Sequence, residues 1–250
     1  MMRTRTLFVS LLAGVAAMAG AQWSQLHGNA QHNGYAGVPL PDSFQLAWET
    51  DLGGPIVSSP VTGPDGTIYV GPVREDTLET PSVAIYAVNP DGSVKWKFRT
   101  PFIEDETFTL PTPAVGPDGT IYIGALNGVF YALNPTGSVK WQKQGDYPVL
   151  QSAAVAPNGN VYVGLDGRLN AFSPAGTLLW QAPMGDPRLS GGPALATDGT
   201  IYSAYAQQDV EVKLVALNPN GSSKWEYPLS LYFWPLGAPV VGQDGSIYVT

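Results

Sequence analysis

Residues able to perform acid–base, nucleophilic or metal chemistry are few in this chain of 250 residues. The only histidines, His27 and His32, are five positions apart, and there is no cysteine. Two imidazoles without a third ligand nearby make a poor metal site. The chain contains no G-x-S-x-G motif, no phosphate-binding loop and no histidine paired with an aspartate in its repeated part. The sequence therefore predicts no catalytic residue, no metal site and no cofactor.

Charged and aromatic residues gather instead in segments of unequal length between β-rich runs. Such segments suit recognition of a peptide or a glycan, because exposed aromatic rings bind these ligands well. Two other interpretations stay open: the aromatic rings pack in the core, and the acidic run is a solvated loop, since its spacing matches no regular Ca²⁺ ligand pattern. The candidate binding residues are Arg74, Asp76, Glu104, Asp105, Glu106, Arg188, Tyr205, Tyr232, Phe233 and Trp234.

The composition is that of a folded, exported type of protein with an acidic surface. Hydrophobic residues make up 44% of the chain and charged residues 13%, which excludes a disordered chain. A formal net charge of -8 disfavours nucleic acids and anionic membranes as partners. The 29 glycines, 23 prolines and 12 tyrosines indicate many short strands joined by tight turns.

Residues 1–21 have the layout of a secretory signal peptide. Arg3 and Arg5 precede an apolar stretch, and Ala19-Gly20-Ala21 is typical of a cleavage site. We expect the mature chain to begin at Gln22; the alternative is an uncleaved N-terminal anchor. With no cysteine for a lipid anchor and no other stretch apolar enough to span a membrane, we expect a soluble monomer that is secreted or periplasmic.

Two short patterns alternate along the rest of the chain. The first is Pro-Asp-Gly-Thr-Ile-Tyr-Val-Gly, and its copies lie at 64–71, 117–124, 157–164, 197–202 and 243–249. In the second, a glycine follows an alanine by five residues and a tryptophan follows the glycine by four. Both patterns mark hairpin turns, so each repeat predicts four strands within roughly 40–50 residues, the size of a propeller blade. The copies of the second pattern are Ala87, Gly92, Trp96; Ala132, Gly137, Trp141; Ala171, Gly176, Trp180; and Ala216, Gly221, Trp225.

The tryptophan of the second pattern begins the outermost strand of each predicted blade. A buried indole needs an acceptor for its N–H group. We expect each ring to contact the neighbouring blade, with the alanine leaving room for it. Truncation of one such ring should then cost about 3–5 kcal/mol of stability.

The second pattern resembles the tryptophan-docking repeat of the PQQ-like β-propeller family, most clearly at residues 132–141. That family includes the quinoprotein dehydrogenases and the propeller lipoprotein of the bacterial outer-membrane barrel-assembly machine. The resemblance covers about Trp48 to Thr250, and Trp23 to Gly37 resembles the lead-in of exported members. The resemblance is specific evidence for the fold but weak evidence for the function, because the repeat encodes packing between blades.

The resemblance implies an all-β propeller of four-stranded antiparallel blades, with a lead-in at 22–44 and the propeller at 45–250. Trp48 lies in a strand-like run without a hairpin partner, and the last repeat supplies half a blade. We therefore expect a chain that is incomplete at its C-terminus; the alternative is a five-bladed ring closed by the Trp48 strand. The expected blades lie at about 55–100, 110–143, 151–182 and 191–228, with a partial blade at 237–250.

The turns at one end of the predicted blades are short and uniform, whereas the loops at the other end vary. Variable loops on a rigid scaffold usually carry function. We therefore expect a non-catalytic module that binds a protein or glycan of the bacterial cell envelope through the variable-loop face. The resemblance leaves one alternative, a PQQ-dependent dehydrogenase or its remnant. As a family these enzymes use Ca²⁺, a catalytic aspartate and often a vicinal cysteine pair, and neither a Ca²⁺ ligand set nor cysteine is found in this sequence.

Overall fold

Short antiparallel strands form nearly all of the computed structural model, which describes residues 24–32, 45–56, 58–75, 82–101, 111–184, 192–207, 211–229 and 237–249. They follow one 3₁₀ turn, η1 (Leu26–Gly28). No helix in these ranges is long and apolar enough to cross a membrane. The strands are β1 (Val61–Thr62), β2 (Ile68–Glu75), β3 (Ser82–Val88), β4 (Val94–Pro101), β5 (Ala114–Val115), β6 (Ile121–Gly124), β7 (Val129–Leu133), β8 (Val139–Gln144), β9 (Ala154–Val155), β10 (Val161–Leu165), β11 (Arg168–Phe172), β12 (Leu178–Pro183), β13 (Ala194–Leu195), β14 (Ile201–Gln207), β15 (Glu211–Leu217), β16 (Ser223–Leu229), β17 (Val240–Val241) and β18 (Ile247–Tyr248).

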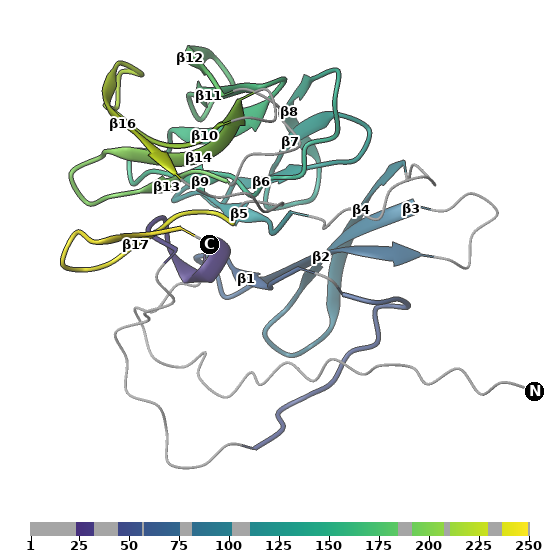
Figure 1. The fold of residues 1–250 in the computed structure, drawn as a ribbon. Coiled ribbons are helices and arrows are strands. Elements are labelled where there is room, and N and C mark those ends of the chain that lie inside the picture. The colour runs from purple at the N-terminus through teal and green to yellow at the C-terminus, as the bar shows by residue number, and fades with distance from the viewer. Residues whose placement is uncertain are drawn as a thin grey trace, which may run out of the picture.

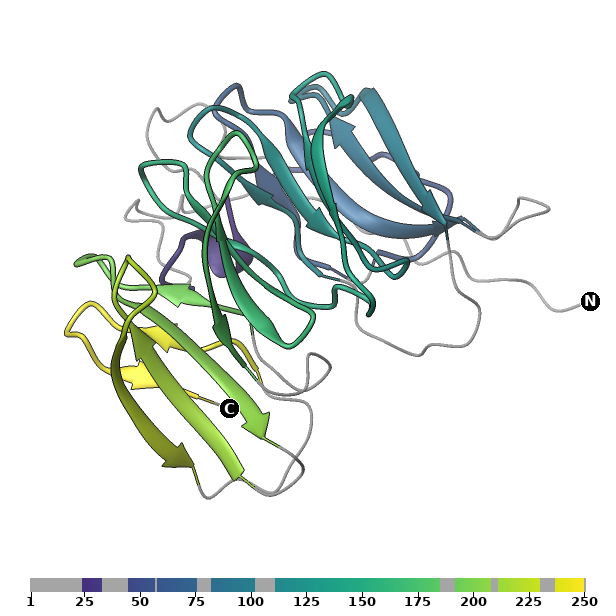
Figure 2. The same cartoon turned by 90° about the horizontal axis from the view of Figure 1, so that it is seen from above.

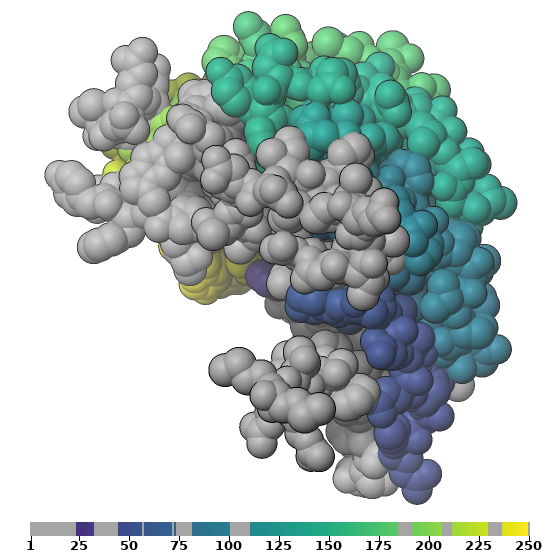
Figure 3. All heavy atoms as spheres, turned by 90° about the vertical axis from the view of Figure 1, so that its right-hand side faces the viewer, coloured from purple at the N-terminus to yellow at the C-terminus, as the bar shows by residue number. Residues whose placement is uncertain are grey.

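Hydrogen bonds join these strands into four sheets of four and one pair, and each strand lies beside its neighbours in sequence (Figure 1). We call the sheets blade 1 (β1–β4), blade 2 (β5–β8), blade 3 (β9–β12), blade 4 (β13–β16) and half-blade 5 (β17–β18). The predicted propeller of four full blades and one partial blade is confirmed. Seen from above, the blades follow one another in an open arc (Figure 2), and the space-filling view shows the same order from blue to yellow-green (Figure 3).

The hydrophobic core lies between successive blades, because alternate residues of a strand point to opposite faces of its sheet. In β6, Ile121 and Ile123 pack against blade 1, whereas Tyr122 between them packs against blade 3. A strand buried on both faces reads as a continuous apolar run, and β6, β7 and β10 are buried throughout. Their sequence therefore lacks the alternation of a sheet with one wet face.

The first pattern forms the turn between the inner two strands of each blade. In blade 2, the Asp118 carboxylate accepts hydrogen bonds from the backbone N–H and hydroxyl of Thr120, at 3.0 and 2.8 Å. Lys140 on the outermost strand donates to both side chains, each at 2.9 Å. The same Lys–Asp–Thr arrangement recurs in blades 1 and 4. The short polar turn thus ties the inner hairpin of a blade to its outer strand.

The second pattern connects each blade to the next. The indole N–H of Trp96 in blade 1 donates to Pro135 O in blade 2 at 2.8 Å, and a Cβ at Gly137 would lie 2.8 Å from Cδ2 of this ring. The expected role of the alanine was wrong: Ala132 is the strand partner of Trp141 in its own blade, and the small residue beneath the neighbour's ring is the glycine. Equivalent contacts join Trp48 to Pro90 and Gly92, Trp141 to Pro174 and Gly176, and Trp180 to Pro219 and Gly221.

Candidate functional site

Residues 24–32 lie on the inner side of the arc, where the innermost strands of the blades meet (Figure 2). β5, β9, β13 and β17 occupy the same position in successive blades, and the second residue of each donates its backbone N–H to this segment. The donor–acceptor pairs are Val115 to Ser24 O at 2.7 Å, Val155 to Gln25 Oε1 at 2.8 Å, Leu195 to Ala30 O at 2.7 Å and Val241 to Gln31 O at 2.8 Å. One short segment therefore contacts four blades.

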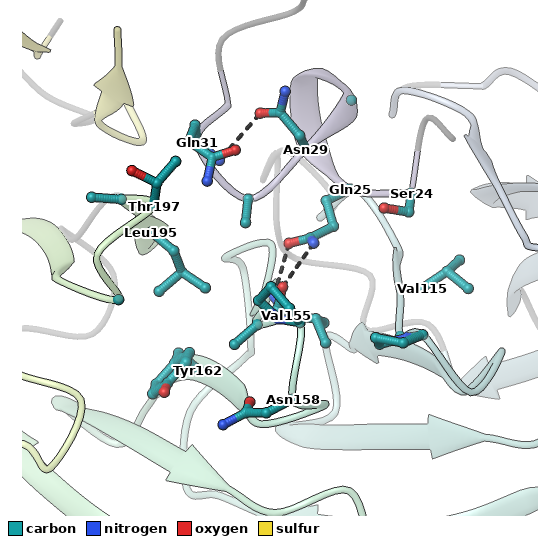
Figure 4. Close-up of a pocket in the computed structure, with 18 of the residues that line it drawn as sticks. Ser24, Gln25, Asn29, Gln31, Val115, Val155, Asn158, Tyr162, Leu195 and Thr197 are labelled. Carbon is teal, nitrogen blue, oxygen red and sulfur yellow. Dashed lines mark hydrogen bonds between the residues drawn. The ribbon is translucent and has the colours of Figure 1, made fainter. Parts of the chain in front are cut away.

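A cavity of about 710 Å³ lies between this segment and blades 2 to 4 (Figure 4). It opens among the short turns, because Pro117, Asn158 and Gly199 of the inner turns line it. None of the described residues that line it is charged. A cavity with amide, hydroxyl and backbone groups but no charge suits a neutral ligand that hydrogen-bonds. Its polar side chains include Gln25, Asn29, Gln31, Asn158, Tyr162 and Thr197.

Blade 3 departs from the repeat at this cavity. Where blades 1, 2 and 4 have an aspartate paired with a lysine, blade 3 has Asn158 and Leu179. Asn158 keeps the turn, since its Oδ1 accepts from the Asn160 N–H at 3.0 Å, and Leu179 is 48% exposed. The substitution thus leaves the fold of the turn intact, and blade 3 lacks the aspartate and lysine charges that the other full blades carry at these positions.

Two histidines fix residues 24–32 against half-blade 5. His32 is 1% exposed, and its Nδ1 donates to Pro239 O at 3.3 Å; His27 Nδ1 donates to His32 O at 3.2 Å. Burial, helped by the nearby His27 ring and opposed by the Pro239 hydrogen bond, lowers the pKa of His32 from 6.5 to about 4. His32 is therefore neutral at physiological pH, and it acts here as a structural residue.

Of the residues predicted from the sequence to bind a ligand, the structure describes Arg74 and Tyr205, and neither is among the described residues that line this cavity. Tyr205 was placed wrongly on an exposed surface: it is 8% exposed and packs between blades 3 and 4, because its position in β14 faces the adjacent sheet. Arg74 lies in β2, opposite Val83, at the end of the blade remote from the short turns. The others lie outside the described residues: Asp76, Glu104, Asp105, Glu106, Arg188, Tyr232, Phe233 and Trp234.

The residues that do form the site were not identified from the sequence. Gln25 and Gln31 belong to no repeat, and their partners are far away in the chain. Asn158 offered a signal, because it breaks an aspartate pattern kept at Asp65, Asp118 and Asp198. Such a change in one blade of a repeat protein indicates that the position serves a purpose other than packing in that blade.

Pyrroloquinoline quinone and Ca²⁺ do not fit the described lining. The quinone carries three carboxylates, which call for cationic partners, and Ca²⁺ prefers several carboxylate and carbonyl oxygens. The lining supplies neither cationic nor carboxylate side chains. Within the described parts of the chain, no three histidine, aspartate or glutamate side chains are grouped so that they could hold a metal ion.

Comparison with known structures identifies propellers of varied activity. A europium-containing methanol dehydrogenase superposes with a TM-score of 0.65 and 15% identity over 87% of this chain and 50% of its own; the chain thus spans half of that enzyme. BamB from Moraxella catarrhalis gives a TM-score of 0.52 and 16% identity over 98% and 87%. A streptogramin B lyase gives a TM-score of 0.56 and 12% identity over 83% of this chain and 65% of the lyase. These likenesses show the fold, and the comparison with curated proteins gave no match.

A family model described as "Outer membrane protein assembly factor BamB" matches residues 41–188 and 165–250. The matched residues include every blade and the four turns that receive a tryptophan. The match also agrees with the PQQ-like repeat recognised in the sequence. The chain is therefore a β-propeller that belongs to the BamB-like family of PQQ-type repeats.

Proposed function

We propose that this chain is an exported, non-catalytic propeller of the cell envelope that binds an extended segment of another protein at the uncharged cavity between residues 24–32 and blades 2 to 4. The observation that carries the proposal is the lining itself. Backbone groups and amide side chains match the backbone of a peptide, which presents one donor and one acceptor per residue and no charge. The family description, an outer-membrane protein assembly factor, supports a protein of the envelope as the partner.

Several other features support the same proposal. The signal-like N-terminus favours export, and the short sequence of basic residues before an apolar stretch is typical of secretory signals. None of the described lining residues carries the charge that a quinone cofactor needs, which favours binding over oxidation. Glycans also hydrogen-bond through neutral groups, so a glycan is the competing ligand that the experiment must separate.

The test is a binding assay of the purified protein on two arrays, one of extended peptides from outer-membrane proteins and one of bacterial glycans. We expect peptides to bind, and the variant Asn158→Asp to bind more weakly, because Asn158 is an exposed residue of the lining and the variant places a negative charge beside a bound backbone whose carbonyl oxygens repel it. Aspartate occupies this position in the other turns, so the variant keeps its fold. Binding confined to glycans, or unaffected by Asn158→Asp, would contradict the proposal.

A matched control carries the same change outside the cavity. Asn220 also accepts a hydrogen bond in a turn, from the Ser222 N–H at 3.1 Å, and blade 1 has Asp91 at the equivalent position. The variant Asn220→Asp adds the same charge and should leave peptide binding unchanged. A parallel titration with pyrroloquinoline quinone and Ca²⁺ tests the enzymatic alternative: a saturable rise in Tm, which for a ligand at 100 times its Kd corresponds to about 2.7 kcal/mol, would overturn a non-catalytic role.

A further inference from the structure

The innermost strands of the propeller carry backbone groups that are open to a second chain. β5, β9 and β13 each pair with one strand only, since they lie at the inner edges of their sheets. An edge strand presents N–H and C=O groups that an extended peptide can join. At these edges Val115, Val155 and Leu195 donate to residues 24–32. The segment therefore occupies the groups that a bound peptide would use.

Gln25 shows which chemical group fits this edge. Its Oε1 accepts from the Val155 N–H at 2.8 Å, and its Nε2 donates to Val155 O at 2.9 Å. The two bonds, drawn as dashed lines in Figure 4, pair one carboxamide with both backbone groups of one residue. Gln25 is 6% exposed, so the pair is shielded from water. A primary carboxamide has a donor N–H and an acceptor oxygen on the same side, whereas the N–H and C=O of one trans peptide unit point in opposite directions, so a single peptide unit cannot form both bonds to Val155.

Residues 24–32 hold this position in an unfavourable conformation. His27 and His32 have φ values of 52° and 59°, a region that residues other than glycine seldom adopt. Nε2 of His32 is buried and has no hydrogen-bond partner among the described residues, which is a further cost. The segment also forms no strand, so it contacts each blade through isolated hydrogen bonds, two of them from Gln25 to Val155, where a β-strand would form a continuous ladder.

We propose that the inner strand edges of blades 2 to 4 form a binding site for an extended, uncharged peptide that carries an asparagine or glutamine side chain, and that residues 24–32 are its intramolecular occupant, displaced by such a peptide. The inference rests on the proposed function and names its ligand class. The lining without charge excludes acidic and basic peptides, and the Val155 pair selects a carboxamide. The strand-edge groups are thus occupied until a ligand of this kind competes for them, whereas the cavity beside them is open.

The first experiment measures the competition directly. A fluorescent peptide with the sequence of residues 24–32, Ser-Gln-Leu-His-Gly-Asn-Ala-Gln-His, is titrated into the full chain, the variant Gln25→Ala and the control Gln142→Ala. Gln142 is exposed on the outer strand β8. In the full chain the tethered segment competes at a high effective concentration. Loss of its two amide bonds should lower the apparent Kd of the added peptide about tenfold in Gln25→Ala and leave it unchanged in Gln142→Ala.

Equal Kd values in all three proteins, or no binding to Gln25→Ala, would overturn the inference. The same peptide with glutamate in place of glutamine at its second position is the ligand control. Its carboxylate accepts from Val155 N–H but cannot donate to Val155 O, so we expect binding at least about tenfold weaker. Binding as tight as that of the glutamine peptide would show that the carboxamide is not selected.

Amide hydrogen exchange gives a readout that does not depend on the added peptide. In Gln25→Ala the amides of Val115, Val155, Leu195 and Val241 should exchange faster as one group, and the added peptide should restore the protection of the first three. A change at Val155 alone would show that residues 24–32 do not leave as a unit, and it would overturn the inference. If these tests fail while array peptides still bind in an Asn158-dependent way, the proposed function stands without a displaceable occupant.

Discussion

The indole N–H of Trp96 donates a hydrogen bond to the carbonyl oxygen of Pro135, 39 residues further along the chain. The same bond joins Trp48 to Pro90, Trp141 to Pro174 and Trp180 to Pro219, at 2.7 to 3.0 Å. In each case the ring lies against the glycine two residues after that proline. One repeated contact therefore connects blade 1 to blade 2, blade 2 to blade 3 and blade 3 to blade 4, and it joins Trp48 to blade 1.

Replacement of Trp96 by alanine should lower the free energy of unfolding by about 3–5 kcal/mol. The change removes the ring that packs on Gly137 and leaves Pro135 O without its donor. Trp225 is the control, because it is 37% exposed and no turn within the described residues receives its ring. Urea denaturation should show a clearly smaller loss for Trp225→Ala; an equal loss would place the stability within blades rather than between them.

Alanine at Gly137 should destabilise the protein more than alanine at Gly245. Both glycines have positive φ, 86° and 82°, so both changes incur the conformational cost of about 1–2 kcal/mol. A Cβ at Gly137 would also meet the Trp96 ring at 2.8 Å, whereas one at Gly245 meets nothing within 4 Å. Overpacking adds about 1–3 kcal/mol. Equal urea midpoints for the two variants would contradict a tight contact beneath the ring.

Stability should fall as the pH is lowered from about 6.5 toward 4, because of His32. Burial keeps its folded pKa at about 4, below the ordinary histidine value of 6.5, so in this interval the unfolded chain binds a proton that the folded protein excludes. The contribution is complete above pH 6.5 and is lost as the pH falls toward 4, on the order of 3 kcal/mol in total. The variant His32→Asn, which tolerates positive φ, should show a flat profile there. The same slope in both proteins would assign the effect to another group.

The charged turns should contribute little to stability, and that contribution should change with pH only at a lower pH than the contribution of His32. Desolvation acts to raise the pKa of Asp118, but hydrogen bonds from Lys140 and Thr120 outweigh it and hold the pKa below 3.8. Their contribution is therefore present above pH 3.8 and lost as the pH falls through the folded pKa. Lys140→Met should cost less than about 1 kcal/mol at neutral pH, and 1 M NaCl should reduce the difference. A larger loss that does not respond to salt would show that Lys140 acts through packing.

The repeat predicted the blades well because blade structure depends on local signals. Hairpin turns such as that at Asp118 and Thr120 are specified by three consecutive residues. The recurrence of tryptophan at Trp96 and Trp141 shows where one blade ends and the next begins. The alanine was wrongly expected to leave room for the ring, since sequence spacing cannot tell which small residue lies under a ring from another sheet. Gln25 could not be placed, because its partner Val155 is 130 residues away and no pattern links them.

The long reach of residues 24–32 has a consequence for how the protein is made. Gln25 can form its hydrogen bonds only when Val155 has been synthesised, and His32 only when Pro239, which is 207 residues later, has been synthesised. In a chain synthesised from its N-terminus, these residues emerge first and complete their hydrogen bonds last, after the blades have stacked. Contacts so distant in sequence form slowly. Until Val155 and Pro239 have been synthesised, residues 24–32 cannot form these bonds, so the earliest part of this segment to leave the ribosome is among the last to reach its folded contacts.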